Sequence, residues 1–243
     1  MENPLAKLVP QFFGDYPKQF LKLYNQVYIP PELNKDEIKD NLWKAFEFGS
    51  RYHEGQKRKS GEPYFNHCVE VAITLAGWNM DYTTIMAGLL HDVVEDTNIT
   101  LGDIEREFNK DLANLVDGLT KISGIEFGTR KEKQAGNFMK MLLSVAKDIR
   151  VIIIKFADRM HNMKTITHMP RMKQRRIAIE TRDVYSPLAH RLGMASVKSK
   201  LDDLAFQVLN KDEYDSIASK LKTTNKQRKK LINSYIDPIS NGL

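Results

Sequence analysis

Cysteine is almost absent from this chain, which has Cys68 alone among its 243 residues. An intramolecular disulfide is therefore excluded, and a reducing compartment such as the cytoplasm fits best. Long apolar runs are absent too, since a stretch such as Val151–Ile154 is far shorter than the roughly 18 residues of a membrane span. The N-terminus lacks the basic start and the apolar stretch of a secretory signal. These absences predict a cytoplasmic protein that does not insert into a membrane.

Charge of one sign is only weakly in excess. Lys and Arg total 37 against 31 Asp and Glu, which gives a formal net charge of +6. Such a modest excess is compatible with an anionic ligand, phosphates included, and equally with a solvated surface of small basic bias. Net charge therefore does not separate a nucleotide ligand from a nucleic acid, and the motifs must decide.

Glycine and proline are also sparse, with 13 and 9 residues, and apolar residues recur at intervals of three and four. This pattern predicts an all-α fold. Val151–Ile154 is β-branched enough to form a strand of its own, but the helical period continues beyond it. Thr100 and Asp103 form the pattern of a capping box. The expected helices cover 16–28, 36–55, 63–78, 82–96, 100–108, 112–122, 132–145, 149–166, 171–191 and 196–209.

Two stretches interrupt the helical pattern. Residues 123–133 contain glycine and many charges, which predicts a mobile loop between helices with a functional role. The sequence turns polar and rich in lysine from residue 211 onward. We expect that stretch to form an outer helix or a connector to a segment that this chain lacks.

The most informative segment is the polar run at 91–96. On one continuous helix with His91 at zero, Glu95, Asp92 and Asp96 fall at roughly 40°, 100° and 140°, opposite an apolar face. The four ionisable side chains are thus expected on the side of a core helix that faces away from the core. A solvated acidic face would more often contain Lys or Arg one turn away, and none is present in this stretch. We therefore interpret the run as a functional site.

A second polar stripe lies on the helix expected at 149–166. With Asp158 at zero, Asn162 and Thr165 fall at roughly 40° and 340° on an otherwise apolar helix. A carboxylate at that place is costly to bury unless it meets a cation or hydrogen-bond donors, which favours a ligand role for Asp158. His67 is a further candidate, although a single histidine of this kind is more often a core residue.

The candidate metal ligands share imidazole or carboxylate groups and include no thiolate; they are His67, His91, Asp92 and Asp158. Such nitrogen and oxygen ligands suit Mn²⁺, Fe²⁺, Co²⁺ or Zn²⁺ and leave positions for water or a phosphate oxygen. A metal ion there would lower the pKa of a water molecule and neutralise charge on a phosphoryl group. Glu95 and Asp96 are placed to orient that water or to shuttle its proton.

A basic loop precedes the segment with His67. Arg58 and Lys59 stand before a turn formed with Ser60 and Gly61. Arginine can stack on a base or pair with a phosphate, and lysine can act as a point charge for a phosphate. The pair therefore predicts binding of a nucleotide next to the metal, although a solvated loop would have the same composition.

At this point several segments, in unbroken order, closely resemble the hydrolase domain of the RelA/SpoT (Rel) family of alarmone enzymes. The likeness runs from about residue 36 to about residue 221 and is highly specific because it includes many ordered motifs. One departure is Cys68, which stands where the family usually has proline. The matching segments are RKSGEPY at 58–64 with His67, DGLTK at 117–121, HDVVED at 91–96, ADRMHNM at 157–163 and YSPLAHRLG at 185–193.

The resemblance implies an all-helical HD-type hydrolase that removes the 3′-pyrophosphate of guanosine tetra- and pentaphosphate, giving GDP or GTP and pyrophosphate, with Mn²⁺ as cofactor. Each site residue follows by its place in a motif. His67, His91, Asp92 and Asp158 match the family's metal ligands, and Glu95 and Asp96 match its catalytic acids. Arg58, Lys59 and Ser60 match the nucleotide-binding loop, and Asn162 and Thr165 match residues that line the guanosine pocket.

The resemblance also implies a domain division. We expect an N-terminal helical segment at 1–35, the HD-type hydrolase at 36–200, and C-terminal helices at 201–243 that lead towards a synthetase domain. The synthetase motifs are absent from this chain, so we expect the hydrolase fragment of a bifunctional stringent-response enzyme, with a naturally short hydrolase as the alternative. The expected partners are the small-molecule substrate and the synthetase and regulatory domains, without direct contact to nucleic acid.

Two other functions stay open from the sequence. The first is an HD phosphohydrolase that acts on another nucleotide, such as NADPH. The second is a domain that binds a nucleotide and regulates a partner without turnover. The complete ligand set argues against the second.

Overall fold

The computed structural model describes residues 16–123 and 147–221, which are helical throughout apart from turns and loops. The chain divides into two compact units between Asn162 and Met163. In the described residues the only β-type pairing is an isolated bridge between Lys57 and Pro63, so the prediction of an all-α fold is confirmed. None of the described helices is long and apolar enough to cross a membrane.

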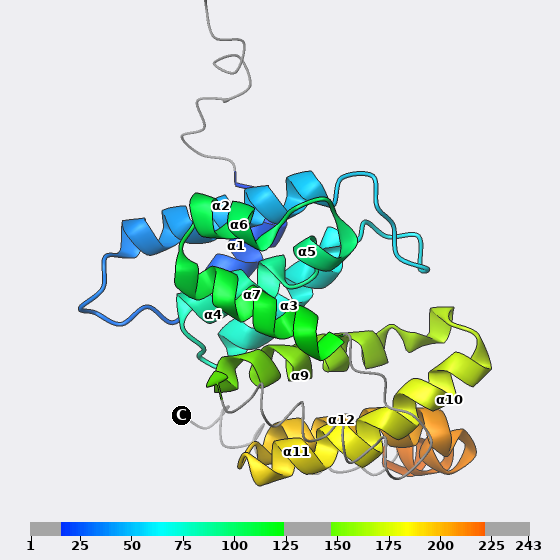
Figure 1. Cartoon of the computed structure of the whole chain (residues 1–243). Coiled ribbons are helices and arrows are strands. Elements are labelled where there is room, and N and C mark those ends of the chain that lie inside the picture. Colours follow the sequence, from blue (N-terminus) through cyan, green and yellow to red (C-terminus); the bar gives the residue numbers. More distant parts are fainter. Residues whose placement is uncertain (1–15, 124–146, 222–243) are drawn as a thin grey trace, which may run out of the picture. The chain divides into compact units, whose positions relative to one another are not determined.

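The first unit contains most of the helices (Figure 1). Their bounds are α1 Lys18–Tyr24, α2 Lys35–Tyr52, α3 Phe65–Gly77, α4 Tyr82–Leu90, α5 Val93–Asp96, α6 Leu101–Glu107, α7 Lys110–Ser123 and α9 Ile149–Lys164, the last of which runs just past the boundary. The capping box predicted at Thr100 and Asp103 opens α6. The run Val151–Ile154 is helical, as expected. The loop and helix predicted at 123–133 and 132–145 lie outside the described residues, apart from Ser123 at the end of α7.

The core of this unit is built around α3 and α4. Both helices are apolar on nearly every side, and α4 contacts α2, α3 and α7. Gly88 allows α4 to approach α3 closely, because a Cβ atom there would lie 2.6 Å from Leu75 Cδ1 and 3.5 Å from Ala72 Cα. The close approach places the end of α4, and the residues that follow it, against the helix with His67.

We expect Gly88→Val to destabilise the fold by about 1–3 kcal/mol, because the new side chain overpacks the contact with the fully buried Leu75. Urea unfolding followed by circular dichroism measures this change. Gly102→Val in α6 is the matched control, since the nearest atom to a Cβ there is 3.7 Å away, and we expect a change within about 0.5 kcal/mol. Equal stability of the two variants would contradict the close packing of α3 and α4.

The single helix expected over 82–96 is the main error in the sequence-based prediction. α4 ends at Leu90, α5 begins at Val93, and His91 and Asp92 form the turn between them. The Asp92 carbonyl oxygen restarts the helix by accepting hydrogen bonds from the amides of Glu95 and Asp96, at 3.1 and 2.8 Å. The prediction that these residues share one polar face was therefore wrong, because His91 is fully buried whereas Glu95 and Asp96 are exposed.

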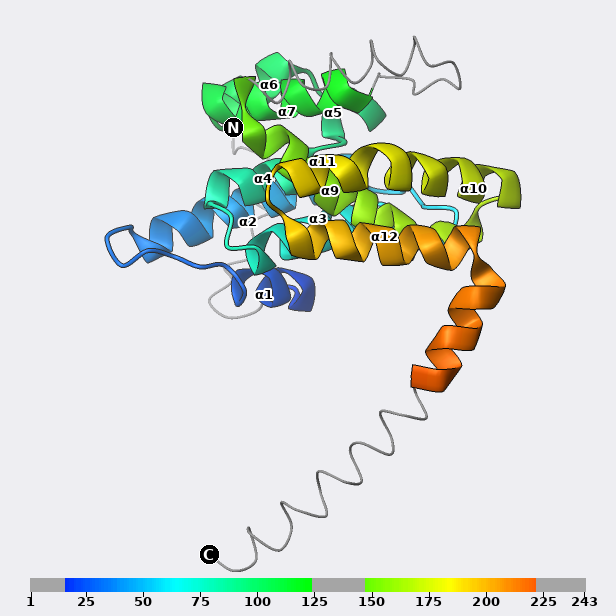
Figure 2. The ribbon, with the colours of Figure 1, turned by 90° about the horizontal axis from the view of Figure 1, so that it is seen from below.

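The second unit contains shorter helices and one long return helix. It comprises the 3₁₀ turn η2 Ile166–His168, α10 Arg171–Glu180, the π-helical turn η3 Thr181–Tyr185, α11 Ser186–Arg191 and α12 Ala195–Leu209, and residues 211–221 are helical as well. Pro187 has no amide hydrogen to donate to the turn before it, which explains the π-helical interruption of the helix predicted at 171–191. Figure 2 shows α12 running back along α10 and α11.

Candidate metal centre

The predicted metal ligands come from three elements of the first unit. His67 is on α3, His91 and Asp92 form the turn after α4, and Asp158 is on α9. His67 Nε2 lies 3.2 Å from Asp158 Oδ1, and His91 Nε2 lies 3.0 Å from Asp92 Oδ2. His67 Nε2 is 3.8 Å from Asp92 Oδ2, and His91 Nε2 is 3.9 Å from Asp158 Oδ1. Ligand atoms that surround one ion at about 2 Å are about 3 Å from one another, so this spacing suits a shared cation.

The orientation of His91 supports a metal ligand at its Nε2 atom. The Nδ1 atom lies 2.8 Å from the carbonyl oxygen of Gly88. A carbonyl can only accept, so Nδ1 bears a proton and Nε2 is left to bind a cation or a second proton. Nε2 is buried and has no hydrogen-bond partner among the described residues. Because an unsatisfied buried nitrogen is costly, the donor set fits a divalent metal ion.

The two carboxylates of the centre are held in their charged form. Burial alone would raise the pKa of Asp158, but the hydrogen bond from His67 and the charge of the buried Lys155 hold that pKa well below its usual value. For Asp92, burial is likewise outweighed by the charge of the adjacent His91, which lowers the pKa. Burial also lowers the pKa of His67, which favours a neutral imidazole. Two carboxylates and a neutral imidazole at one place attract a cation.

His91 responds in the opposite direction. Burial would lower its pKa, but the negative charge of Asp92, 3.0 Å from Nε2, raises the pKa well above the usual value of a histidine. The nearby carboxylates therefore stabilise a positive charge at His91 Nε2, which either a proton or a metal ion supplies. A metal ion that binds there has to displace this proton.

Tyr64 supports the centre although it was not predicted as a site residue. Its hydroxyl donates a hydrogen bond to Asp92 Oδ2 at 2.7 Å, and its ring stacks on His53 with centroids 5.1 Å apart. Burial and the charge of Asp92 raise the pKa of Tyr64, so the hydroxyl keeps its proton and remains a donor. Tyr64 belongs to the motif at 58–64 and could have been singled out there, but its contact with Asp92 depends on how α3 packs.

We expect Tyr64→Phe to weaken Mn²⁺ binding about tenfold, because a hydrogen bond that orients a ligand typically contributes that much to metal affinity. The phenyl ring keeps the stacking on His53, so the melting temperature is expected to change little. Isothermal titration with Mn²⁺ measures the affinity, and Tyr28→Phe at an exposed position is the matched control. Unchanged affinity in Tyr64→Phe would contradict an orienting role.

The predicted nucleotide-binding loop is a tight turn beside the centre. The Arg58 amide donates to the Glu62 carbonyl and the Gly61 amide donates to the Arg58 carbonyl, both at 2.9 Å. Gly61 has a φ of 88°, a conformation that favours glycine. Lys59 is exposed and Ser60 is half-buried within this turn. The loop therefore presents its polar side chains from a fixed backbone.

Arg58 connects this loop to α9. Its Nη2 atom donates to Asn162 Oδ1 at 2.6 Å, and its Nη1 atom lies 3.0 Å from His161 Nδ1. Asn162 Nδ2 in turn donates to Asp158 Oδ1 at 2.5 Å. Arg58 is thus one side chain away from a predicted metal ligand. Thr165 lies just beyond α9 in the second unit and precedes η2, so its role stays a prediction.

The predicted catalytic acids are on the short helix α5. Glu95 and Asp96 are exposed there, directly after the turn that contains His91 and Asp92. The side chain of Gln56 fixes the end of α5 by donating to the carbonyl oxygen of Asp96 at 2.8 Å. The Asp96 carboxylate is close enough to Tyr64 to contribute to the raised pKa of that hydroxyl. Asp96 is therefore near Asp92 and reachable by water.

Cys68 lies unexpectedly close to the centre. Its sulfur is within 4.8 Å of a donor atom of His91 and of Asp92. The thiol is fully buried, and burial raises its pKa, so it is held as a neutral thiol. A thiol is a poor metal ligand compared with a thiolate, which agrees with the predicted set of nitrogen and oxygen ligands.

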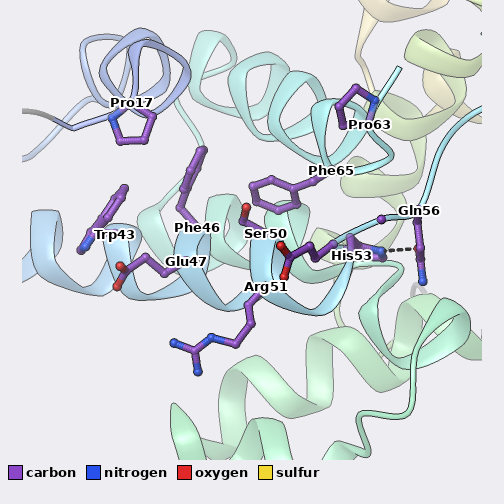
Figure 3. Close-up of a pocket in the computed structure, with 12 residues that line it drawn as sticks. Pro17, Trp43, Phe46, Glu47, Ser50, Arg51, His53, Gln56, Pro63 and Phe65 are labelled. Carbon is purple, nitrogen blue, oxygen red and sulfur yellow. Dashed lines mark hydrogen bonds between the residues drawn. The ribbon is translucent and has the colours of Figure 1, made fainter. Parts of the chain in front are cut away.

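A pocket of about 520 Å³ lies apart from the predicted ligands, none of which lines it. Figure 3 shows the aromatic rings of Trp43, Phe46 and Phe65 around it, with His53 joined to Gln56 by a hydrogen bond of 2.8 Å. Glu47, His53 and Glu54 also line the pocket, but among the described residues they do not belong to a group whose ligand atoms could surround one metal ion.

The chain is similar to known proteins over most of its length. The "Bifunctional (p)ppGpp synthase/hydrolase SpoT" of Escherichia coli K12 is 45% identical over 218 residues, which cover 90% of this chain and 30% of the relative. The "Guanosine-3′,5′-bis(diphosphate) 3′-pyrophosphohydrolase" of Spiroplasma citri is 42% identical over 214 residues, 88% of this chain and 28% of the relative. A "GTP pyrophosphokinase" of Myxococcus xanthus is 42% identical over 234 residues, 95% of this chain and 30% of the relative.

These relatives are much longer proteins, of which this chain spans about 30%. A solved structure described as a metazoan ortholog of SpoT that hydrolyzes ppGpp is 26% identical, with a TM-score of 0.51, and covers 74% of this chain and 97% of its own. The sequence profile of the HD domain matches residues 45–195. The chain therefore belongs to the HD domain family, and the resemblance of its motifs to the hydrolase domain of the RelA/SpoT enzymes is confirmed.

Proposed function

We propose that this chain is a metal-dependent hydrolase that removes the 3′-pyrophosphate from guanosine tetra- and pentaphosphate. The observation that carries the proposal is the cluster of His67, His91, Asp92 and Asp158, with a buried, unpartnered nitrogen between carboxylates, in a chain of this family. Relatives named as 3′-pyrophosphohydrolases support the choice of substrate. Within a longer protein, we propose that residues 36–200 form the hydrolase and that 201–243 lead towards a synthetase domain.

Mn²⁺ is the metal ion that we propose for the centre, since imidazole and carboxylate ligands suit it and no thiolate competes. When bound, such an ion neutralises charge on the phosphoryl group and makes a nearby water molecule more acidic. His67, His91, Asp92 and Asp158 would hold it. The hydroxyl of Tyr64 and the ammonium group of Lys155 keep the two carboxylates oriented and charged.

The remaining predicted residues act on the nucleotide. Lys59 and Ser60 are presented by the turn towards phosphates, and Arg58 binds a phosphate or the base after giving up its contact with Asn162. Asn162 and Thr165 would contact the guanosine.

Glu95 and Asp96 supply the proton transfers of the proposed reaction. A water oxygen forms a new bond to phosphorus while the bond between phosphorus and the 3′-oxygen breaks. The exposed carboxylate of Asp96 takes the proton from the water, and the same proton neutralises the leaving 3′-oxygen. Glu95, on the same short helix, is the second carboxylate, and its proposed role is to orient the water.

A panel of nucleotides tests this proposal. Purified protein with Mn²⁺ is offered guanosine tetraphosphate, GTP and NADPH, and pyrophosphate and orthophosphate are measured separately. We expect pyrophosphate and GDP from guanosine tetraphosphate and no product from GTP, which has no 3′-pyrophosphate. Faster release of orthophosphate from NADPH would indicate another substrate, and binding of guanosine tetraphosphate without any product would indicate a regulatory domain.

A further inference from the structure

The two ring nitrogens of His67 face different partners. Nε2 lies 3.2 Å from Asp158 Oδ1, on the side of the candidate metal centre. Nδ1 lies 2.7 Å from His161 Nδ1, with the two ring centroids 4.8 Å apart. His161 was not among the predicted site residues, because its contact with α3 cannot be seen from its place on α9.

The short distance between the two ring nitrogens means that one of them bears a proton and the other does not. A hydrogen bond between two Nδ1 atoms requires one donor and one acceptor. If His67 binds a metal ion through Nε2, its Nδ1 atom must bear the proton, so His161 Nδ1 is the acceptor. His67 is buried, and therefore no solvent molecule can easily replace His161 in this role.

Arg58 is a second possible donor to His161 Nδ1. Its Nη1 atom lies 3.0 Å from His161 Nδ1, and an imidazole nitrogen has one lone pair for both donors. The guanidinium keeps a separate bond to Asn162 Oδ1 at 2.6 Å, so it does not depend on His161 alone. Within residues 16–123 and 147–221, His67 Nδ1 has no second partner of this kind.

We infer that His161 is a positioning residue for the metal centre: it accepts the Nδ1 proton of His67 and so turns Nε2 of that ring towards the metal. The inference rests on the proposed function, since it assumes that His67 is a metal ligand. Arg58 competes for the same lone pair, so a metal ion that holds His67 in this tautomer frees one end of the Arg58 guanidinium for the nucleotide.

Direct Mn²⁺ binding tests the inference without turnover. Free Mn²⁺ is measured by its electron paramagnetic resonance signal during titration of metal-stripped protein, and circular dichroism checks the fold of each variant. We expect His161→Ala and His161→Leu, which both lack the acceptor, to weaken Mn²⁺ binding about 10- to 100-fold. His161→Asn places an amide oxygen near the position of Nδ1 and is expected to restore affinity to within about threefold of the original protein.

His168→Ala is the matched control, because it removes an exposed histidine that is not among the residues placed at the centre. We expect its Mn²⁺ affinity to equal that of the original protein. Equal Mn²⁺ affinity of folded His161→Ala or His161→Leu and the original protein would overturn the inference, and so would a His161→Asn variant as weak as His161→Ala. Failure of the original protein itself to bind Mn²⁺ would instead overturn the proposed metal centre.

Discussion

Asp92→Ala is expected to abolish Mn²⁺ binding and to lower pyrophosphate release about a thousandfold or more, which corresponds to about 4 kcal/mol of transition-state stabilisation. The Asp92 Oδ2 atom contacts two other residues of the centre, Tyr64 Oη at 2.7 Å and His91 Nε2 at 3.0 Å. Its removal leaves His91 without the adjacent carboxylate and takes away one negative charge. Metal content after purification in Mn²⁺, together with the rate of pyrophosphate release, measures both effects.

The control for this prediction is Asp40→Ala, which removes an exposed carboxylate on α2. Its metal content and rate are expected to equal those of the original protein. Full metal content and full activity in Asp92→Ala would show that the metal assignment is wrong.

Asp96→Asn is expected to lower kcat about a hundredfold or more while Mn²⁺ binding is retained, because a positioned acid or base contributes at least this much to a proton transfer. The Asp96 side chain is exposed, and the contact from Gln56 is made to its backbone carbonyl, so the amide variant keeps the structure of α5. The rate and the metal content, measured on the same sample, separate the two roles.

Glu95→Gln is the companion variant on the same short helix, and a smaller loss of kcat is expected there because Glu95 only orients the water. A loss of bound Mn²⁺ in Asp96→Asn would contradict the proposed division, since it would make Asp96 a metal ligand. An unchanged kcat would remove Asp96 from the catalytic step.

Periodicity was enough to predict the fold class and most helices, since apolar faces repeat along the chain and the capping pattern at Thr100 is local. It failed at His91 and Asp92, where the helix ends without a glycine or a proline. The turn is stabilised by contacts that no local pattern contains: the bond from His91 Nδ1 to Gly88 and the bond from Tyr64 to Asp92. Residues that are adjacent in sequence therefore do not share the face that a helical wheel assigns to them.

The candidate site was predicted in part for the same reason. The ligand types could be recognised from the residues and from their resemblance to a family, because metal chemistry needs imidazole and carboxylate groups. The supporting roles proposed for Tyr64 and His161 could not, because they depend on contacts between residues far apart in the sequence, whereas Lys155 lies one turn before Asp158 on the same helix. Their roles depend on distances of a few ångströms that only the packed chain defines.

The most direct test of the central claim is the release of pyrophosphate from guanosine tetraphosphate by metal-stripped protein, with and without added Mn²⁺. The cluster of His67, His91, Asp92 and Asp158 predicts no release without metal, and release of pyrophosphate with GDP as the co-product once Mn²⁺ is added. Equal rates with and without Mn²⁺, or no release under either condition, would contradict it.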